Sequence, residues 1–366
     1  MTLVSPTESQ REAWNAFAAQ APFFAMIQSW EWGEFKEKLG WRAVRLAIEE
    51  QGQILASAQM LIKPIPSGLV SIAYVPGGPL GNWQDKATMS RLLAELVRVA
   101  RQHRAIFLRI EPAHLNDPTT HQFLCRQGFR YNPYTNQPRT TIILDLTPDL
   151  DDILKQMRKK TRQYIRRAAR EGVTVRIGGR EDLSAFYDLV QITGQRGGFS
   201  PRIRDYYEYE WQTFASNERA ILLMAYYQDQ LLAGRMAFCF GNRAAEFHAG
   251  SSDEYTHLRP NYLLVWEAIK WAKARGCCTY DLWGIPDEVG QAIYEGKDLP
   301  KEERTGGLWG VYRFKRGFSE KVVYYVGAHD YVFSRPLHWL VTNQLLEKSA
   351  LDTIATRLDL LRWIRR

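Results

Sequence analysis

The chain has 366 residues, of which 45% are hydrophobic and 24% are charged, and its formal net charge is +8. This length predicts about two domains that each bury a core, and the composition excludes a largely disordered or low-complexity chain. No apolar run approaches the roughly 20 residues of a membrane span, and the first residues lack the basic and apolar regions of a signal peptide. We therefore expect a cytoplasmic protein.

Two hairpin-like segments, residues 51–58 and 228–235, match in order and lie between apolar runs. Each is followed by a strand and loop, a helix and a second strand. These elements are predicted at residues 70–80, 87–102 and 105–110 in the first half and at residues 246–253, 261–274 and 278–283 in the second. The spacing is too long for a solenoid repeat. We therefore predict an α/β (α+β) fold in which two tandem acetyltransferase-like domains have mixed sheets flanked by helices.

The predicted first domain spans residues 1–148, and the predicted second domain spans residues 149–335. Residues 336–366 are predicted to form a C-terminal amphipathic helical tail, and the sequence ends in a segment rich in arginine and tryptophan. Such a tail suits packing against the second domain, and it also suits peripheral contact with a membrane surface.

A strongly basic segment runs from Asp151 to Gly172 and is predicted to form one amphipathic helix. Its candidate polyanion-binding residues are Arg158, Lys159, Arg162, Arg166 and Arg167. A solvated helix face would explain the pattern, but few acidic residues are interleaved to neutralise the bases. RNA phosphates, a nucleotide diphosphate or an anionic membrane would each suit this helix.

Well-known catalytic signatures are missing from the sequence. It has no nucleophile elbow, no phosphate-binding Walker loop and no dinucleotide fingerprint, and its histidines and cysteines lack metal-ligand spacing. We therefore predict no metal and no cofactor. Acetyltransferase-like units often hold the pyrophosphate of coenzyme A at a glycine-rich helix start. Neither half has that loop, which argues against coenzyme A as the donor.

Several short segments together resemble the Fem family (FemABX), over about residues 10 to 335. They lie at residues 28–36, 74–79, 248–251, 260–264, 280–285 and 311–318, with the basic helix between the second and the third. The resemblance implies tandem acetyltransferase-like domains of the compact type, without a coiled-coil arm. It also implies transfer of an aminoacyl group from aminoacyl-tRNA to an amine of the peptidoglycan stem peptide, which forms the interpeptide bridge.

The same resemblance implies the partners of the chain. The donor would be aminoacyl-tRNA, and the acceptor would be UDP-MurNAc-pentapeptide or a lipid-linked peptidoglycan precursor. The aromatic and basic tail favours the lipid-linked form and places the protein at the inner face of the membrane. We expect a monomer.

Two residues of this chain match a family Phe-Lys pair, and they are the catalytic candidates. Lys315 would stabilise the oxyanion of the tetrahedral intermediate, for which a compact positive charge is suited. Phe314 would pack in the channel that receives the acceptor end of the tRNA. Without the resemblance, Lys315 would read as a lysine on a helix surface.

Four residues match precursor-binding positions of the family. Lys36, on a short predicted helix, corresponds to a lysine that binds the precursor diphosphate. Arg202 and Tyr206 are four residues apart at the start of a predicted helix, so they would share one face. His248 stands where the family usually has a tyrosine. It would donate the same hydrogen bond, or it would indicate a different acceptor.

The residues do not identify the general base. Asp281 is well placed at the end of a predicted strand, but it would equally suit a structural role, and substrate phosphate or water would also take the proton. Two other functions stay open. One is an acyl-CoA-dependent or Fem-like N-acyltransferase that acts on another amine acceptor, and the other is a non-catalytic module that binds RNA or a membrane.

Overall fold

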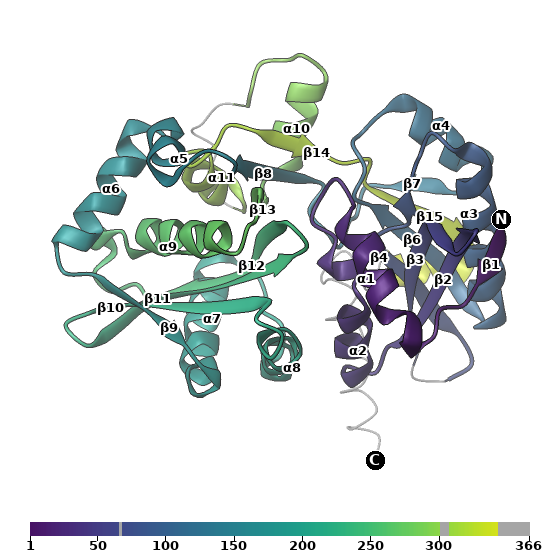
Figure 1. Cartoon of the computed structure of the whole chain (residues 1–366), viewed down its shortest axis with the longest axis horizontal. Coiled ribbons are helices and arrows are strands. Elements are labelled where there is room, and N and C mark those ends of the chain that lie inside the picture. Colours follow the sequence, from purple (N-terminus) through teal and green to yellow (C-terminus); the bar gives the residue numbers. More distant parts are fainter. Residues whose placement is uncertain (66–67, 301–306, 343–366) are drawn as a thin grey trace. The chain divides into compact units, whose positions relative to one another are not determined.

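The computed structural model describes residues 1–65, 68–300 and 307–342, and the chain divides into two compact units. Among these residues, the first unit contains those from Met1 to Arg139 and from Tyr325 to Thr342, and the second contains those from Thr140 to Tyr324. Each unit has a mixed sheet with helices on both faces (Figure 1). Within the described ranges, no helix is long and apolar enough to cross a membrane.

The sheet of the first unit has the strand order β1-β2-β3-β4-β6-β15-β7, with β5 paired to β3. Its strands are β1 (Thr2–Val4), β2 (Arg42–Glu50), β3 (Gln53–Pro64), β4 (Ser71–Gly77), β5 (Leu80–Gly81), β6 (Ala105–Pro112), β7 (Arg130–Asn132) and β15 (Ala328–Val332). Its helices are α1 (Arg11–Ala19), α2 (Trp30–Lys38), α3 (Lys86–Gln102), α4 (Pro118–Arg126) and α12 (Arg335–Leu340).

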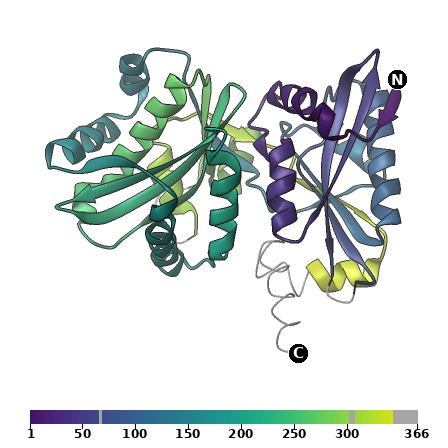
Figure 2. The ribbon, with the colours of Figure 1, turned by 60° about the horizontal axis from the view of Figure 1, so that its bottom comes forward.

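Alternation along β2 explains why helices cover both faces of this sheet. Leu46 and Ile48 belong to the large core cluster that includes the apolar side chains of α3, whereas Ala47 packs with Trp14 and Trp30 near α1 and α2. Successive side chains of a strand point to opposite faces, so one strand serves two cores. Figure 2 shows α2 and α3 on opposite sides of the sheet.

The sheet of the second unit has the strand order β14-β8-β13-β12-β11-β10-β9. Its strands are β8 (Thr140–Asp145), β9 (Thr174–Gly178), β10 (Ala220–Tyr227), β11 (Gln230–Phe240), β12 (Arg243–Ser251), β13 (Thr279–Gly284) and β14 (Val322–Tyr324). Its helices are α5 (Leu150–Gln156), α6 (Lys159–Arg170), α7 (Leu183–Gly197), α8 (Arg204–Ala215), α9 (Pro260–Ala274), α10 (Asp287–Tyr294) and α11 (Trp309–Lys315). Helix α9 covers one face of the sheet with α6 packed on it, and α7 covers the other (Figure 1).

The predicted internal duplication is confirmed. Strands β2 and β3 form the first hairpin, and β10 and β11 form the second. Both turns, Gln51-Gly52 and Gln228-Asp229, have positive φ at the two central residues, as two-residue hairpins of type I′ require. In each unit a helix then connects two parallel strands, β4 to β6 through α3 and β12 to β13 through α9. The two matching sequence segments therefore encode the same turn.

The units of the structure do not follow the boundaries predicted after residues 148 and 335. Strand β8 pairs with β13 and β14, so the second unit begins at Thr140. Strand β15 lies between β6 and β7, which returns the chain to the first unit at Tyr325. Both differences arise from pairing between strands that are far apart in the sequence.

The start of the predicted C-terminal tail packs on the first unit, not on the second as expected. His338 of α12 lies 2.9 Å from a carboxylate oxygen of Asp330, and its ring lies 5.1 Å from the ring of Phe107. The side chains of Leu337, Trp339 and Leu340 are exposed. Residues 343–366 of the tail lie outside the described residues.

The basic segment forms two helices and not the single helix that the sequence predicted. Helix α5 ends at Gln156, and Met157 has extended backbone (φ −68°, ψ 154°) before α6 begins at Lys159. The Arg162 guanidinium donates to the carbonyl oxygen of Lys155 at 2.9 Å and to that of Met157. The last carbonyl groups of a helix have no intrahelical partner, so this side chain stabilises the break.

Candidate active site

A cavity of about 370 Å³ lies in the second unit. Strands β11, β12 and β13 and helices α7 and α11 contribute to its wall. The lining residues are Thr193, Phe199, Arg235, residues 246–251, Asn261, Leu282, Trp283, Leu308, Gly310, Val311, Phe314 and Lys315. Apolar walls with a few charged groups are typical of small-molecule sites.

Lys315, the last residue of α11, is buried in this wall. Its side chain is 8% exposed, and Nζ donates a hydrogen bond of 2.9 Å to the carbonyl oxygen of Gly284. Burial lowers the pKa of Lys315 to about 8, against the pull of Glu246 and Asp281, which favour the charged form. Lys315 is therefore not a surface lysine, and it holds a proton that the site can stabilise or release near neutral pH.

Arg235 and Glu246 form a buried ion pair on the same wall. They lie on the neighbouring strands β11 and β12, with 2.5 Å between guanidinium Nη1 and Oε1, and both side chains are at most 5% exposed. The hydroxyl of Tyr280 donates to the other carboxylate oxygen at 3.1 Å. Nε of Arg235 is buried without a hydrogen-bond partner among the described residues. The ion pair therefore satisfies only part of the hydrogen-bonding capacity of the Arg235 guanidinium.

Asp281 is buried but is not among the residues that line the cavity. Its Oδ1 accepts a 2.7 Å hydrogen bond from the amide of Trp283, which has a φ of 65°. Burial raises the pKa of Asp281 to about 7, although the charge of Lys315 opposes this change. Asp281 therefore holds a strained residue of the wall in place and acts on Lys315 through its charge.

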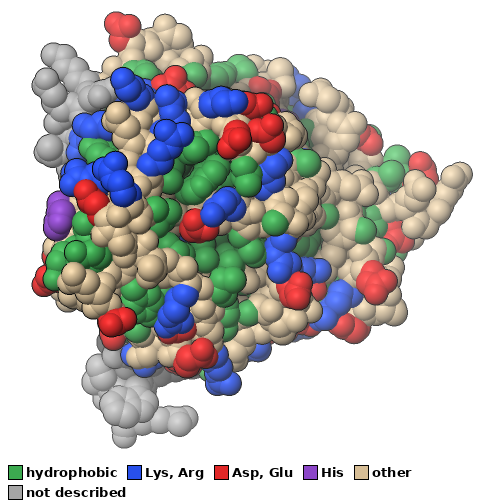
Figure 3. Space-filling view, turned by 60° about the vertical axis from the view of Figure 1, so that its left-hand side comes forward, with side chains coloured by type: hydrophobic (Ala, Val, Ile, Leu, Met, Phe, Trp, Pro, Cys, Tyr) green, Lys and Arg blue, Asp and Glu red, His purple; other side chains and the backbone are tan. Residues whose placement is uncertain are grey.

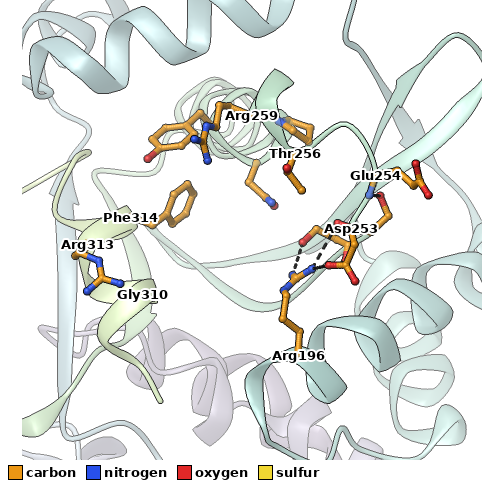
Figure 4. A pocket seen from close by; sticks show the side chains of 13 residues that line it. Arg196, Asp253, Glu254, Thr256, Arg259, Gly310, Arg313 and Phe314 are labelled. Carbon is orange, nitrogen blue, oxygen red and sulfur yellow. Dashed lines mark hydrogen bonds and ion pairs between the residues drawn. The ribbon is translucent and has the colours of Figure 1, made fainter. Parts of the chain in front are cut away.

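A second cavity of about 400 Å³ adjoins the first and shares Ser251, Asn261, Gly310 and Phe314 with it. Three arginines, Arg196, Arg259 and Arg313, contribute to its wall, and Arg196 pairs with Asp253 (Figure 4). The aromatic rings of Tyr262 and Phe314 lie 4.8 Å apart between their centroids. Figure 3 shows Lys and Arg side chains around a patch of hydrophobic side chains. Arginines with aromatic rings suit a ligand that has both phosphates and bases.

The structure brings three predicted precursor contacts together. The Arg202 guanidinium lies 5.6 Å from the ring centroid of Tyr206, and the Tyr206 ring lies 6.0 Å from that of His248. Arg202 and Tyr206 do not share a helix face as predicted, because α8 begins only at Arg204. Tyr207, the neighbour of Tyr206, has its ring 4.8 Å from that of His248, and burial raises its pKa.

Lys36 belongs to the first unit and is also buried. It lies near the end of α2 with 3% of its surface exposed, and Nζ is 5.3 Å and 5.2 Å from the ring centroids of Trp32 and Phe35. An ammonium group between aromatic rings is stabilised by their π electrons. The fold therefore buries Lys36 against aromatic rings, whereas Lys38, two residues further along the chain, is exposed.

The predicted polyanion-binding residues of α6 divide into two groups. Arg158 pairs with Glu320 (Nε to Oε1, 3.1 Å), Arg167 pairs with Glu171 (2.7 Å), and Arg162 bonds the carbonyl groups at the helix break. Lys159 and Arg166 are exposed and make no ion pair with other described residues. The exposed charge of α6 is therefore smaller than the sequence alone indicates.

Sequence reasoning missed Arg235, Glu246 and Glu210. The Glu210 side chain is fully buried and contacts His248 at 2.7 Å. Charged residues inside apolar strand patterns were a usable signal for the first two, because burial of a lone charge is costly unless it is paired. Their pairing across adjacent strands required knowledge of the strand register. Nothing in the local pattern of α8 distinguishes Glu210 from exposed acidic residues nearby.

Comparisons with known proteins agree with this architecture. A model described as "FemAB family" matches residues 10–126, and one described as "Acetyltransferase (GNAT) domain" matches residues 155–295. The Lipid II:glycine glycyltransferase of Staphylococcus epidermidis is 24% identical over 397 aligned positions, which cover 89% of this chain and 92% of that relative. The crystal structure of FemX superposes with a TM-score of 0.80 at 21% identity and covers 93% of this chain and 100% of that one.

A tandem GNAT protein from the clavulanic acid biosynthesis pathway has a similar fold. Its TM-score is 0.54 at 12% identity, and the match covers 90% of this chain and 97% of that one. The two sheets, each with a hairpin and a helical crossover, together with these matches define a tandem acetyltransferase-like protein. The partial family match and the similar relatives support membership of the Fem family. These findings support an acyltransferase.

The raised pKa of Asp281 predicts a pH-dependent cost to stability. A carboxyl group whose folded-state pKa is raised stabilises the fold at low pH, and this contribution is lost as the pH rises through about 7. Asp281→Asn keeps an acceptor for the Trp283 amide and cannot ionise. Between pH 5 and pH 7, the free energy of unfolding of the wild type should fall by about 2 kcal/mol relative to this variant.

Urea titrations at both pH values measure this difference. Asp188→Asn, at an exposed position of α7, is the matched control and should follow the wild type. A constant difference between the wild type and Asp281→Asn at the two pH values would contradict the prediction.

Proposed function

We propose that this chain transfers an aminoacyl group from aminoacyl-tRNA to the amine of a peptidoglycan precursor stem peptide, which builds an interpeptide bridge. The observation that carries the proposal is Lys315, buried in a cavity wall next to Phe314 in a chain similar to the Fem family. The names of the relatives, Lipid II:glycine glycyltransferases, support peptidoglycan as the acceptor and glycine as the amino acid.

The arginine-lined cavity supports RNA as the donor. An aminoacyl ester on the terminal ribose of tRNA carries phosphates and bases beside the reacting carbonyl. The second cavity offers arginines and aromatic rings, and through Phe314 it continues into the cavity that holds Lys315. Two exposed basic residues of α6, Lys159 and Arg166, would add contacts to more distant phosphates of the tRNA.

The reaction converts an ester into an amide, so it needs no further activation. In the tetrahedral intermediate the carbonyl oxygen becomes an oxyanion, and a positive charge in a dry site stabilises it strongly. Lys315 is mostly protonated at neutral pH, since its pKa is about 8, and it supplies that charge. The guanidinium of Arg235, which also lines this cavity, adds a second positive charge to the same wall.

The acceptor in this proposal is the lipid-linked precursor, met by a cytoplasmic monomer at the inner face of the membrane. The exposed Leu337, Trp339 and Leu340 of α12 suit contact with the headgroup region. Lys36, Arg202, Tyr206 and His248 are the residues that would contact the precursor.

A transfer assay tests the proposal directly. Radiolabelled amino acids on a charged total-tRNA pool are offered to UDP-MurNAc-pentapeptide and to lipid-linked precursor, with ribonuclease-treated donor as the control. Label in either acceptor that disappears with ribonuclease establishes the donor, the amino acid and the acceptor. Absence of label from both would overturn the proposal and favour coenzyme A or another amine.

Lys315→Met should abolish most transfer without weakening precursor binding. Loss of one group that stabilises an oxyanion lowers kcat by about 100- to 1,000-fold, while the acceptor keeps its contacts. The assay compares kcat and KM with those of Lys321→Met, which removes an exposed lysine nearby. Wild-type kcat in the Lys315 variant would show that the catalytic assignment is wrong.

Lys36→Met should have the opposite effect. If Lys36 binds the precursor diphosphate, its loss raises KM for the acceptor about tenfold or more and changes kcat little, because removal of a charged hydrogen bond costs about 1.5 to 3 kcal/mol. Lys38→Met, two residues along the same helix, is the exposed control. Thermal unfolding checks that the Lys36 variant keeps its fold.

Reversal of charge on α6 should weaken RNA binding in a salt-dependent way. Lys159→Glu with Arg166→Glu removes two exposed cations of α6 that make no ion pair with other described residues, so the slope of log Kobs against log salt should become shallower by about 1.5 to 2. Filter binding of charged tRNA between low and high salt measures this slope. Arg126→Glu with Arg130→Glu, in the first unit, has the same net charge change and should leave the slope unaltered if α6 is the contact.

A further inference from the structure

His248 and Glu210 form a hydrogen-bonded pair at the wall of the cavity that holds Lys315. Nε2 of His248 lies 2.7 Å from Oε2 of Glu210. The Glu210 side chain, from α8, is fully buried, whereas that of His248, from β12, is 14% exposed and lines the cavity. A buried carboxylate therefore holds the ring of a histidine that a ligand in the cavity can reach.

This contact decides which ring nitrogen carries the hydrogen. An ionised carboxylate only accepts hydrogen bonds, so Nε2 of His248 donates to Glu210 and Nδ1 keeps its lone pair. Nδ1 has no hydrogen-bond partner among the described residues, and Oε1 of Glu210 is buried without one. Nδ1 is therefore the ring atom whose lone pair is available to a ligand in the cavity.

The other groups around His248 are mostly neutral rings. Tyr206 and Tyr207 of α8 and Phe238 of β11 lie with ring centroids 6.0, 4.8 and 6.5 Å from that of His248. The guanidinium of Arg202 lies 5.6 Å from the ring centroid of Tyr206, and its charge also acts on Tyr207. Elsewhere on the cavity wall, the charges of Arg235 and Glu246 pair with each other, and Lys315 is cationic. Glu210 is thus the acidic group that contacts the ring.

Asp281, the base candidate from the sequence, is less suited to this task. It does not line the cavity, and its carboxylate is occupied by the Trp283 amide. His248 and Lys315 line the same cavity, so a base and a group that stabilises an oxyanion are available to one bound substrate.

We propose that His248 is the general base of the aminoacyl transfer and that Glu210 is its positioning residue; this rests on the function proposed above. Nδ1 of His248 removes a proton from the acceptor amine as the amine nitrogen attacks the ester carbonyl carbon. When the intermediate collapses, the new C–N bond stays and the bond from the carbonyl carbon to the ribose oxygen breaks. His248 returns the proton to that oxygen, which leaves as a hydroxyl, and Glu210 stabilises the imidazolium between the two steps.

The variant His248→Tyr distinguishes a general base from a residue that only contacts the precursor. Tyrosine keeps an aromatic ring with a hydrogen-bond donor, as the Fem resemblance would have at this position, but it is not a base at neutral pH. We expect kcat to fall about 100-fold with little change in the KM of the acceptor. A residue that only binds the precursor would give wild-type kcat with tyrosine in its place. His257→Tyr, at an exposed position that lines neither cavity, is the matched control.

The division of the effect between kcat and KM tests the role of Glu210. Glu210→Gln keeps the hydrogen bond but not the charge beside the imidazolium, so kcat should fall about tenfold with little change in the KM of the acceptor. If this variant does not fold, as thermal unfolding would show, chemical rescue decides instead. Imidazole added to His248→Ala should restore transfer, whereas it should not restore Lys315→Met.

The outcomes separate the two proposals. A wild type that transfers to neither acceptor contradicts the proposed function, and the assignment of the base falls with it. An active wild type with unchanged kcat in His248→Tyr, together with unchanged kcat in Glu210→Gln or no rescue of His248→Ala by imidazole, overturns the base assignment alone.

Discussion

The buried ion pair between Arg235 and Glu246 is the interaction on which the site depends. Two neighbouring strands each carry a charge into an otherwise apolar sheet, and each charge would be costly without the other. Together they keep the cavity wall polar and close to neutral, so that Lys315 can be buried there as a cation. Asp281, which does not line the cavity, also favours the charged form of Lys315. Burial therefore lowers the pKa of Lys315, while the surrounding carboxylates oppose the loss of its proton.

Both units contain a buried pair of a tyrosine and a glutamate, but the surroundings of the glutamate differ. In each, a tyrosine donates to a glutamate across the parallel strand pair: Tyr74 to Glu111 in the first unit, and Tyr280 to Glu246 in the second. The backbone amides of Asn136 and Gln137 complete the bonding of Glu111 at 2.6 and 2.9 Å. Glu246 instead bonds an arginine and faces a cavity. The glutamate of the first unit is thus bonded by a loop, whereas that of the second unit lines a cavity.

Local features of the sequence were sufficient for the repeated architecture. The hairpin turns and the crossover helices depend on residues close together in the chain, and the helix predicted at residues 87–102 is α3 within one residue. Long-range pairing was beyond the same reasoning. The position of β15 between β6 and β7, and the partners of Arg235, require the strand register. The break before α6 arises from one arginine that bonds carbonyl groups, which helical periodicity does not reveal. The resemblance, and not the pattern, singled out Lys315 and Lys36, whose burial explains why they differ from the exposed lysines around them.

The return of β15 to the first sheet has a consequence for how the chain is made. The second unit is an insertion whose first and last strands, β8 and β14, pair with each other, and the amide of Tyr325 donates to the carbonyl of Arg139 at 2.8 Å directly outside that pair. During synthesis the first sheet stays incomplete until β15 leaves the ribosome, more than 180 residues after Arg139. Folding of the second unit brings its two ends together through the pairing of β8 with β14. Most of the entropic cost of closing this long loop is therefore met before β15 joins the first sheet. Folding of the second unit thus allows the first sheet to be completed. If the ribosome stalls within the second unit, the first sheet lacks β15, the strand that lies between β6 and β7.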